Sequence, residues 1–381
     1  MYRFDLMHKD LKVAELKIDG TGYLGNVYNV CSPEHLPCGT VRNGVVDRRE
    51  LSLWWEQRAI PQRRSGIRGL LDFFFIEYVG VIIPRSMGLN LSDQYWIRPR
   101  GKDISWEDVN YFDNPFSEDV GDLLFGKGPA GGGKVDYSSP DIMTDGVLKK
   151  RWRIENGTRC LIKMGARFLM QESYNEVIAS RIADALSIEH VPYGLIHVGR
   201  DIGSICPDMI DRDTEFITAY RVSKMMEHGG DTSSYDHYVK VCDSMGIDVV
   251  PSLDRMIVLD YLMLNRDRHA GNFGIIRDAN TLEWLRPAPI FDNGTSLKHD
   301  EAIHNILSSE IGRSRPFRRT FEEQLDLVSS FDWIDVDALE RIPGIIMEVM
   351  SEGNGWVYQD RTEALVELMG SRIEGLMQRM D

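Results

Sequence analysis

The chain has 381 residues, enough for two or three domains, and its 43% hydrophobic content supports well-filled cores rather than disorder. With 59 acidic residues against 44 Lys and Arg, the formal charge of −15 argues against general binding to nucleic acid or to anionic membranes. The five cysteines form no C-x-x-C pair, the N-terminus lacks a signal-peptide pattern, and the most apolar stretch is too short to span a bilayer. A soluble cytoplasmic protein is expected.

Residues 1–124 are expected to form a separate N-terminal α/β domain that packs against or recognises something. Within it, residues 51–60 predict a helix, residues 69–79 a second helix or a strand, and residues 89–99 a turn and a strand. Two clusters of arginine interrupt the acidic chain, and each is either a salt-bridged surface or a site for an acidic substrate. They are Arg58, Arg63, Arg64 and Arg68, and Arg313, Arg315, Arg318 and Arg319.

A glycine-rich stretch over residues 125–138 partly matches a phosphate-binding loop. Residues 128–134 fit G-x-x-x-x-G-K, but Val135 stands where a P-loop needs Ser or Thr to bind magnesium. The strand signal before it is short, and Pro140 prevents a stable helix from following directly. We therefore interpret the stretch as a linker. Replacing Lys134 by Ala should leave nucleotide binding unchanged.

A small α+β lobe is predicted over residues 139–212. Residues 147–164 contain two strand-like runs joined by Asn156-Gly157, a strong hairpin-turn signal. An amphipathic helix is expected over residues 171–188, followed by two or three short strands over residues 191–210. Strand hairpin, helix and further strands together predict a mixed lobe with a small sheet.

Helical periodicity dominates residues 213–381, which are expected to form a helical lobe. Residues 251–264 predict a buried helix with Ser252 as its N-cap. Further helices are expected over residues 319–328, 335–350 and 360–380. A sheet-rich lobe followed by a helical lobe leaves a cleft between them, which is a common place for a ligand.

The residues that carry chemistry are concentrated in residues 265–297. A buried helix ends there in a polar run, and a hairpin turned at Ala279–Asn280 returns the chain, so Asp292 is expected beside Asn272. Together with the Asp267 carboxylate, they form a set that suits phosphoryl transfer. Magnesium takes oxygen ligands, and a carboxylate near the acceptor hydroxyl can accept its proton. The alternative is a salt-bridged helix end followed by an ordinary turn.

Lys163 lies in an apolar strand, where an ammonium group is costly unless it is paired. Contacts with nucleotide phosphates and with a glutamate of the following helix would satisfy it. Glu172 and Glu176 both border the apolar stripe of that helix, and we prefer Glu176 because it lies deeper in the helix. The alternative is a strand lysine whose end reaches solvent.

These residues resemble the HipA-like serine/threonine kinases of bacterial toxin–antitoxin modules, over about residues 138–381. The matching elements are Asp267-Arg268-His269 with Asn272, Ile290-Phe291-Asp292, the strand of Lys163 and the passage over residues 175–194. The resemblance implies a two-lobed protein-kinase-like fold that binds ATP and Mg²⁺. It implies Asp267 as catalytic base with His269 in the same loop, and Asn272 and Asp292 as metal ligands.

The same resemblance implies that Lys163, paired with Glu176, contacts the phosphates. It places adenine against the backbone of Met209 and Ile210. It assigns the loop that covers the phosphates to Thr144, Asp145 and Gly146, although this stretch lacks the usual glycine- and glutamine-containing sequence of the family.

The implied partners are a protein substrate and a small DNA-binding antitoxin. The N-terminal third does not clearly resemble that of the toxin kinases, and the catalytic set does not choose between a protein and another hydroxyl acceptor. A non-catalytic nucleotide-binding or partner-binding module on the same scaffold is the alternative.

Overall fold

The computed structural model describes residues 2–127, 135–166, 170–308, 311–352 and 359–380. The glycine-rich segment that resembles a P-loop, residues 128–134 with Lys134, therefore lies outside the described residues. Within the described part, no helix combines the length and the apolar character that crossing a membrane requires.

The N-terminal part is built on a four-stranded sheet of order β3-β2-β1-β6. Its strands are β1 (Tyr2–His8), β2 (Leu11–Ile18), β3 (Leu24–Tyr28) and β6 (Tyr95–Pro99), and a separate short pair is β4 (Val41–Arg42) and β5 (Val45–Val46). All pairings are antiparallel, which makes this part α+β rather than the α/β type expected.

Helices pack on both faces of this sheet: the helix of Trp106 lies on the face of Met7 and Trp96, and the other three lie on the opposite face. They are α1 (Arg48–Gln57), α2 (Ile67–Phe74), α3 (Trp106–Val109) and α4 (Asp119–Leu124), with short 3-10 turns η1 (Pro33–His35), η2 (Val79–Val81), η3 (Ile83–Ser86) and η4 (Pro140–Met143). The predicted helix over residues 51–60 and the strand over residues 89–99 are present as α1 and β6, and residues 69–79 begin as helix α2. Leu6, Leu16, Trp55 and Leu70 share one buried apolar core between the sheet and the helices.

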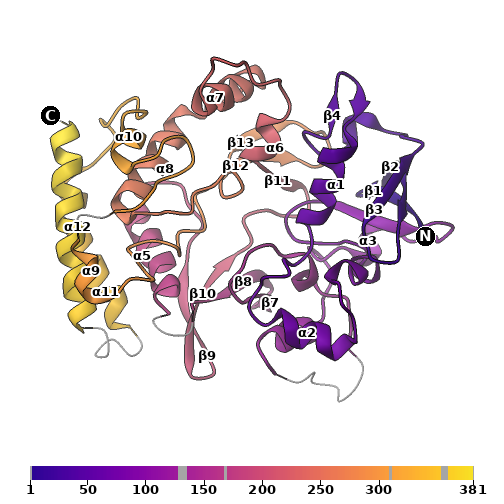
Figure 1. Cartoon of the computed structure of the whole chain (residues 1–381), viewed down its shortest axis with the longest axis horizontal. Helices are drawn as coiled ribbons and strands as arrows, with labels where there is room; N and C mark the ends of the chain where they lie inside the picture. The colour runs from indigo at the N-terminus through magenta and orange to yellow at the C-terminus, as the bar shows by residue number, and fades with distance from the viewer. Residues whose placement is uncertain (1, 128–134, 167–169, 309–310, 353–358, 381) are drawn as a thin grey trace.

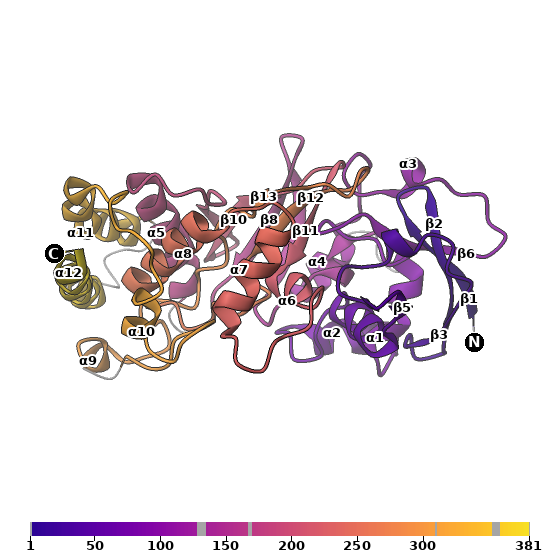
Figure 2. The same ribbon diagram turned by 90° about the horizontal axis from the view of Figure 1, so that it is seen from above.

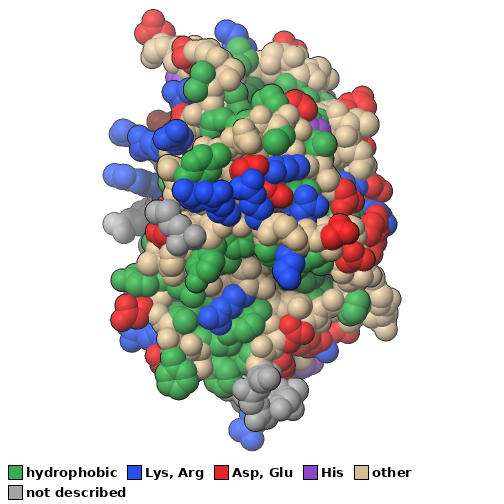
Figure 3. Space-filling model, turned by 90° about the vertical axis from the view of Figure 1, so that its right-hand side faces the viewer, with side chains coloured by type: hydrophobic (Ala, Val, Ile, Leu, Met, Phe, Trp, Pro, Cys, Tyr) green, Lys and Arg blue, Asp and Glu red, His purple; other side chains and the backbone are tan. Residues whose placement is uncertain are grey.

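The outer face of the N-terminal sheet carries charged side chains that are mostly paired with one another. Figure 3, which looks at this end of the molecule, shows Lys and Arg side chains in a band across its middle. Lys12 forms ion pairs with Asp5 at 2.9 Å and with Glu15 at 3.0 Å, and Arg98 and Arg100 reach the same two carboxylates. These pairs are partly buried, and charged side chains on a sheet face of this kind disfavour pairing with another chain.

A second antiparallel sheet follows in the order β7-β8-β10-β9. Its strands are β7 (Lys150–Glu155), β8 (Thr158–Met164), β9 (Gly194–Val198) and β10 (Asp201–Pro207), and α5 (Gln171–Ala185) packs against it. The turn between β7 and β8 is the predicted Asn156-Gly157, and both residues have positive φ, 51° and 84°. That geometry is the reason why Asn-Gly is favoured in two-residue hairpins.

Helix α5 is buried on almost all sides, although an amphipathic helix was expected. Twelve of its fifteen residues are buried, because the helix lies between the second sheet and α11 (Val336–Ser351). Most of its polar residues face protein groups instead of water. Asn175, for example, donates to the backbone oxygens of Gly294 and Ser296 at 2.9 and 2.7 Å.

The remainder of the chain combines a three-stranded sheet with helices. The sheet has the order β11-β12-β13, made of β11 (Thr214–Thr218), β12 (Gly274–Asp278) and β13 (Trp284–Pro287). The β12–β13 hairpin was predicted, but β11 lies in a region expected to be helical and pairs with a strand about sixty positions later. The helices are α6 (Ala219–Ser223), α7 (Ser234–Ser244), α8 (Val250–Met263), α9 (Ile303–Ile306), α10 (Phe321–Leu325), α11 and α12 (Gln359–Met380).

Helix α8 begins earlier than predicted, and Ser252 is not its N-cap. The helix starts at Val250 after Val249, so that Pro251 falls in the first turn. Proline is well tolerated there, because the first N–H groups of a helix have no partner within the helix. Ser252 therefore lies inside the helix.

Figures 1 and 2 show the elements in a row, from the N-terminal sheet at one end, through β7–β13, to α11 and α12 at the other. The N-terminal part is joined to the middle of the row by buried polar contacts. Gln94 donates to the backbone oxygens of Asp211 and Thr214, at 3.0 and 2.7 Å, and the Arg277–Glu215 ion pair of β12 and β11 lies beneath His8.

Candidate active site

The loop that carries Asp267 is fixed by backbone and side-chain hydrogen bonds. Helix α8 ends at Met263, the following Leu264 adopts a left-handed conformation, and the next residue, Asn265, is fully buried. Asn265 donates to Asp260 at 2.9 Å and accepts from the backbone N–H of Asp267 at 3.1 Å. The Asp267 carboxylate itself is 46% exposed, and within the described residues its ion pair is with Arg315. The backbone of Asp267 is therefore held in place, while its carboxylate remains accessible.

Arg268 joins this loop to the segment around Asp292. Its side chain is fully buried and forms a two-pronged ion pair with Asp260 of α8, at 2.8 and 2.9 Å. The same guanidinium donates to the backbone oxygens of Asn272 and Phe291 and to Oδ1 of Asn293. Five donors in one plane make arginine suited to such a junction. The sequence analysis named Arg268 only as part of a motif. The presence of Asp260 inside the buried helix α8 was a signal that a basic partner such as Arg268 would be needed.

Lys163 of β8 lies at the centre of a buried charged cluster. Its Nζ donates to Glu176 at 2.8 Å, to Asp292 at 2.7 Å and to the hydroxyl of Tyr193 at 3.1 Å. Glu176 also accepts from the backbone N–H of Asn293 at 2.8 Å. The structure therefore pairs Lys163 with Glu176, whereas Glu172 faces the backbone of residue 166 and His299.

The charges in this cluster stabilise one another. Burial opposes the cation on Lys163, but the carboxylates of Asp292 and Glu176 hold the pKa of the ammonium well above its ordinary value. Burial also opposes the anion on Asp292, but Lys163 and Lys150 hold the pKa of that carboxyl far below its ordinary value. Both groups therefore stay charged around neutral pH.

A pocket of about 690 Å³ opens beside Lys163. Asp292 is presented to it from a left-handed backbone conformation, with φ of 60°, which is rare for residues other than glycine and recurs at functional sites. Of the catalytic, metal-binding and nucleotide-binding residues that the family resemblance implies, Glu176 alone does not line the pocket; it pairs with Lys163, which does. The others that line it are Thr144, Asp145, Gly146, Lys163, Met209, Ile210, Asp267, His269, Asn272 and Asp292.

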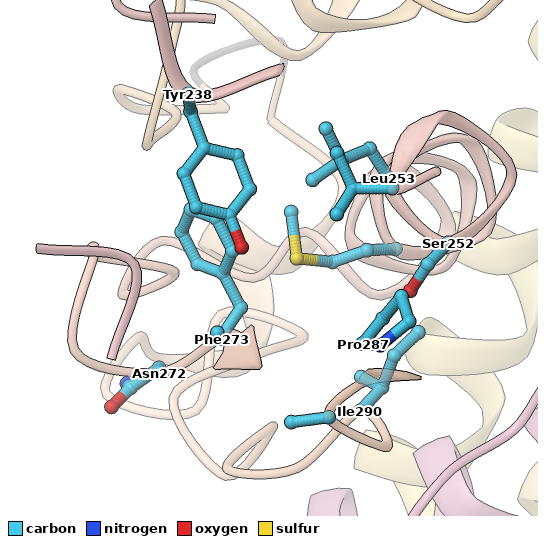
Figure 4. Close-up of a pocket in the computed structure, with 11 residues that line it drawn as sticks. Tyr238, Ser252, Leu253, Asn272, Phe273, Pro287 and Ile290 are labelled. Atoms are coloured by element: carbon cyan, nitrogen blue, oxygen red, sulfur yellow. The ribbon is translucent and has the colours of Figure 1, made fainter. Parts of the chain in front are cut away.

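Asn272 stands between this pocket and an apolar wall. Its amide nitrogen donates to the backbone oxygen of Asp267 at 3.1 Å, which leaves the amide oxygen as the end that can serve as a ligand. The next residue, Phe273, points the other way. Figure 4 shows it with Tyr238, Leu253 and Ile290 around a small hollow of about 10 Å³. Packing of this wall holds Asn272 in place.

The donor set fits magnesium bound together with a nucleotide better than a metal held by protein alone. Among the described residues, no group of three or more His, Cys, Asp and Glu could hold a metal ion. Asp292 and Asn272 offer only oxygen atoms, and Mg²⁺ is usually held by one or two protein ligands together with phosphates and water.

His269 has a different place from Asp267. Its ring is exposed, and Nδ1 accepts a hydrogen bond from the backbone N–H of Gly271 at 3.0 Å. Its backbone N–H donates to the oxygen of Asp267 at 2.8 Å. The structure thus gives His269 a part in shaping the turn between Asp267 and Asn272, at the edge of the pocket.

The loop of Thr144, Asp145 and Gly146 is held from behind by the N-terminal part. Arg64, 1% exposed, donates to the backbone oxygen of Gly146 at 2.9 Å and to that of Thr144. The backbone of residues 60–65 adds hydrogen bonds to the oxygens of Ile142 and Val147. Arg64 is thus a positioning residue that sequence reasoning placed only in a cluster of surface or substrate-binding arginines.

Two further residues of the pocket were not singled out from the sequence. Lys150 of β7 lies opposite Lys163 in the strand register, and its side chain packs directly against Gly146. It is a second cation on the pocket wall. Tyr193 contacts Lys163 through its hydroxyl, and burial raises its pKa well above the ordinary value. Two adjacent lysines in LKKRW were a weak signal for the first.

The chain is similar to one family model and to solved structures of other proteins. Residues 140–352 match the family model of the HipA-like C-terminal domain. A chain of the Shewanella oneidensis MR-1 toxin–antitoxin complex of HipA, HipB and operator DNA is similar in structure, with a TM-score of 0.54 and 14% identity over 97% of this chain and 96% of that one. The Helicobacter pylori proinflammatory kinase CtkA aligns with a TM-score of 0.48 and 20% identity, over 61% of this chain and 94% of its own. No curated protein matches the sequence.

Proposed function

The chain belongs to the HipA-like C-terminal domain family, and from this membership we propose that it is an ATP- and Mg²⁺-dependent kinase that phosphorylates a hydroxyl group of a protein. One observation carries the proposal: the Lys163–Glu176 pair, Asp292, Asn272 and Asp267 meet at a single pocket. Phosphoryl transfer needs few groups beyond a cation on the phosphates, a metal site and a carboxylate at the acceptor.

We assign the residues of the pocket as follows. The backbone of Met209 and Ile210 binds adenine, and Lys163 contacts the phosphates. Asp292 and Asn272 hold Mg²⁺, which when bound offsets the charge that develops on the phosphate oxygens. The two-lobed division at residue 212, and the boundaries of the N-terminal domain and linker, are part of the same proposal.

Asp267 has the role of general base. The oxygen of the acceptor hydroxyl forms a bond to the γ-phosphorus, while the bond from that phosphorus to the bridging oxygen breaks and its electron pair leaves with ADP. The proton of the hydroxyl passes to the Asp267 carboxylate. Asn265 and Arg268 hold the backbone of Asp267 in one position relative to the segment that precedes Asp292.

The test is label transfer from γ-labelled ATP to the chain itself or to proteins of a cell lysate in the presence of Mg²⁺. We expect transfer by the wild-type chain. If ATP raises the melting temperature but no label moves with any divalent metal, the non-catalytic nucleotide-binding module is the better description.

An Asp292→Ala variant should lose Mg²⁺-dependent ATP binding, because it removes the one carboxylate of the proposed metal site. Lys134→Ala is the matched control, and it should bind ATP like the wild-type chain. Isothermal titration with ATP and Mg²⁺ measures both. If Lys134→Ala loses ATP binding and Asp292→Ala keeps it, the nucleotide binds at the glycine-rich segment instead.

An Arg64→Met variant should bind ATP about tenfold more weakly, although Arg64 does not line the pocket. The change releases the backbone of Thr144 and Gly146, so the loop no longer has one position. Arg68→Met, an exposed change in the same segment, is the control. Unchanged affinity in Arg64→Met, with an unchanged melting temperature without ATP, would show that the loop does not contact the nucleotide.

A small DNA-binding antitoxin remains a proposed partner. The similar Shewanella chain comes from a complex of HipA, HipB and operator DNA, which motivates the proposal. The discriminating observation is a neighbouring gene for a small helix-turn-helix protein whose product co-purifies with this chain. Failure of such a product to co-purify would separate the chain from the toxin–antitoxin setting.

A further inference from the structure

A rigid loop rich in arginine lies beside Asp267. Residues 313–319 precede α10, and the loop is anchored at two points. The ring of Phe317 packs on Tyr235 and Phe273, with centroids 5.2 and 5.8 Å apart, and buried Ser314 accepts from Gln324 at 3.1 Å. The side chains that point outward from this anchored loop are the exposed Arg313, Arg315, Arg318 and Arg319.

Arg315 contacts the proposed base directly. Its Nη1 lies 3.3 Å from Oδ1 of Asp267, and the two side chains are 59% and 46% exposed. Such an exposed pair is weak and easily exchanged for another partner. While it persists, the Asp267 carboxylate has a cation where an acceptor proton would arrive, so it is a poorer base.

The other three arginines are free to bind a ligand. Among the described residues, the guanidinium groups of Arg313, Arg318 and Arg319 form no ion pair, hydrogen bond or ring contact. In a chain with a formal charge of −15, unpaired cations gathered on one short loop are unusual. They raise the local concentration of anions around the loop that holds Arg315 against Asp267.

Building on the proposed kinase function, we propose that residues 313–319 select protein acceptors whose hydroxyl is flanked by acidic side chains. The acceptor's carboxylates pair with Arg313, Arg318 and Arg319, and one of them draws Arg315 away from Asp267. Binding of a matching acceptor thereby frees the base. A short acidic peptide fits this better than nucleic acid, because the acidic remainder of the chain repels an extended polyanion.

The binding test uses two fluorescent serine peptides, one with glutamates around the serine and one with glutamines in their place. Anisotropy titrations should show about tenfold tighter binding of the glutamate peptide to the wild-type chain. A variant with Arg313, Arg318 and Arg319 all changed to Gln should lose this preference while binding ATP normally. Arg341→Gln, an exposed change on α11, is the matched control and should keep it. Equal affinity for both peptides in the wild-type chain would overturn the proposal.

Label transfer to the same peptides tests the part assigned to Arg315. An Arg315→Gln variant should phosphorylate the glutamine peptide severalfold faster than the wild-type chain, through a higher kcat, because Asp267 is free without an acidic acceptor. A lower kcat on both peptides would overturn this part.

The outcomes for the kinase function and for the arginine loop are distinguishable. If the glutamate peptide binds through the arginines but no label moves to any acceptor, the kinase function fails and acid recognition stands. If label moves without preference for acidic flanks, the kinase function stands and the selection fails. A single-stranded RNA of equal charge that binds more tightly through the same arginines would also overturn the assignment to acidic peptides.

Discussion

An Asp267→Asn variant is expected to transfer phosphate about 10² to 10⁴ times more slowly than the wild-type chain while it binds ATP with nearly the same affinity. The carboxylate is 46% exposed and pairs only with Arg315 among the described residues, so its loss leaves no buried charge without a partner. The amide keeps the size of the side chain but cannot take the acceptor proton. Single-turnover label transfer and an ATP titration on the same preparation measure the two quantities.

The neighbouring histidine provides the control for that result. His269 accepts from the backbone of Gly271 at the rim of the pocket, so His269→Gln should alter the turn and reduce turnover far less than Asp267→Asn. A larger loss of turnover in His269→Gln, at unchanged ATP affinity, would move the proton-accepting role from Asp267 to His269.

Local sequence signals were sufficient for elements whose formation is decided within a few residues. The two-residue turn of the β7–β8 hairpin requires positive φ at both positions. Asn156-Gly157 adopts such φ values readily, so the hairpin could be predicted from these two residues. The polar run after the apolar helix over residues 251–264 indicated residues that line the pocket, among them Asp267, His269 and Asn272. The beginning of α8 was wrong by a few residues, because Pro251 at the first turn outweighed the capping signal of Ser252.

Contacts between distant segments were beyond local reasoning. Strand β11 forms because Thr214 to Thr218 pair with β12, about sixty positions away. The sequence of the strand alone does not indicate this pairing. Arg64 reaches Gly146 across 82 positions, and Arg315 reaches Asp267 across 48. An arginine in a cluster has the same sequence signature whether it is buried against a loop or open to solvent. The N-terminal part contributes to the pocket through just such contacts.

A Lys163→Met variant is expected to lower the free energy of unfolding by about 3–5 kcal/mol at neutral pH. Lys163 is 6% exposed and is the ion-pair partner of both Glu176 and Asp292. Its loss leaves the buried Glu176 carboxylate without its ion-pair partner, whereas Asp292, 30% exposed, keeps the charge of Lys150 nearby. Denaturant unfolding measures the change. The double variant with Glu176→Gln should recover part of the loss, because it removes the buried carboxylate that has lost its partner. Full additivity of the two single changes would mean that the pair does not interact.

The pH dependence of this deficit has a definite sign. Burial already raises the pKa of Glu176 in the wild-type chain, and Lys163 opposes that rise. Without Lys163 the carboxyl binds a proton more readily in the folded state than in the unfolded state, so acid stabilises the variant relative to the wild-type chain. The deficit should therefore shrink as pH falls from neutral towards the range in which buried carboxyl groups are protonated. A deficit independent of pH would trace the loss to packing.

The same variant tests whether Lys163 binds the nucleotide or serves only as a structural ion-pair partner. If Lys163 contacts phosphates, Lys163→Met should lose most of the rise in melting temperature that ATP and Mg²⁺ give the wild-type chain, since ligand stabilisation falls with affinity. The two chains are compared at the pH where the loss of unfolding free energy in the variant is smallest, so that both are folded to the same extent. An ATP-induced rise as large as that of the wild-type chain would confine Lys163 to holding Glu176 and Asp292 in place. The phosphate contact would then pass to Lys150, the other cation on that wall of the pocket.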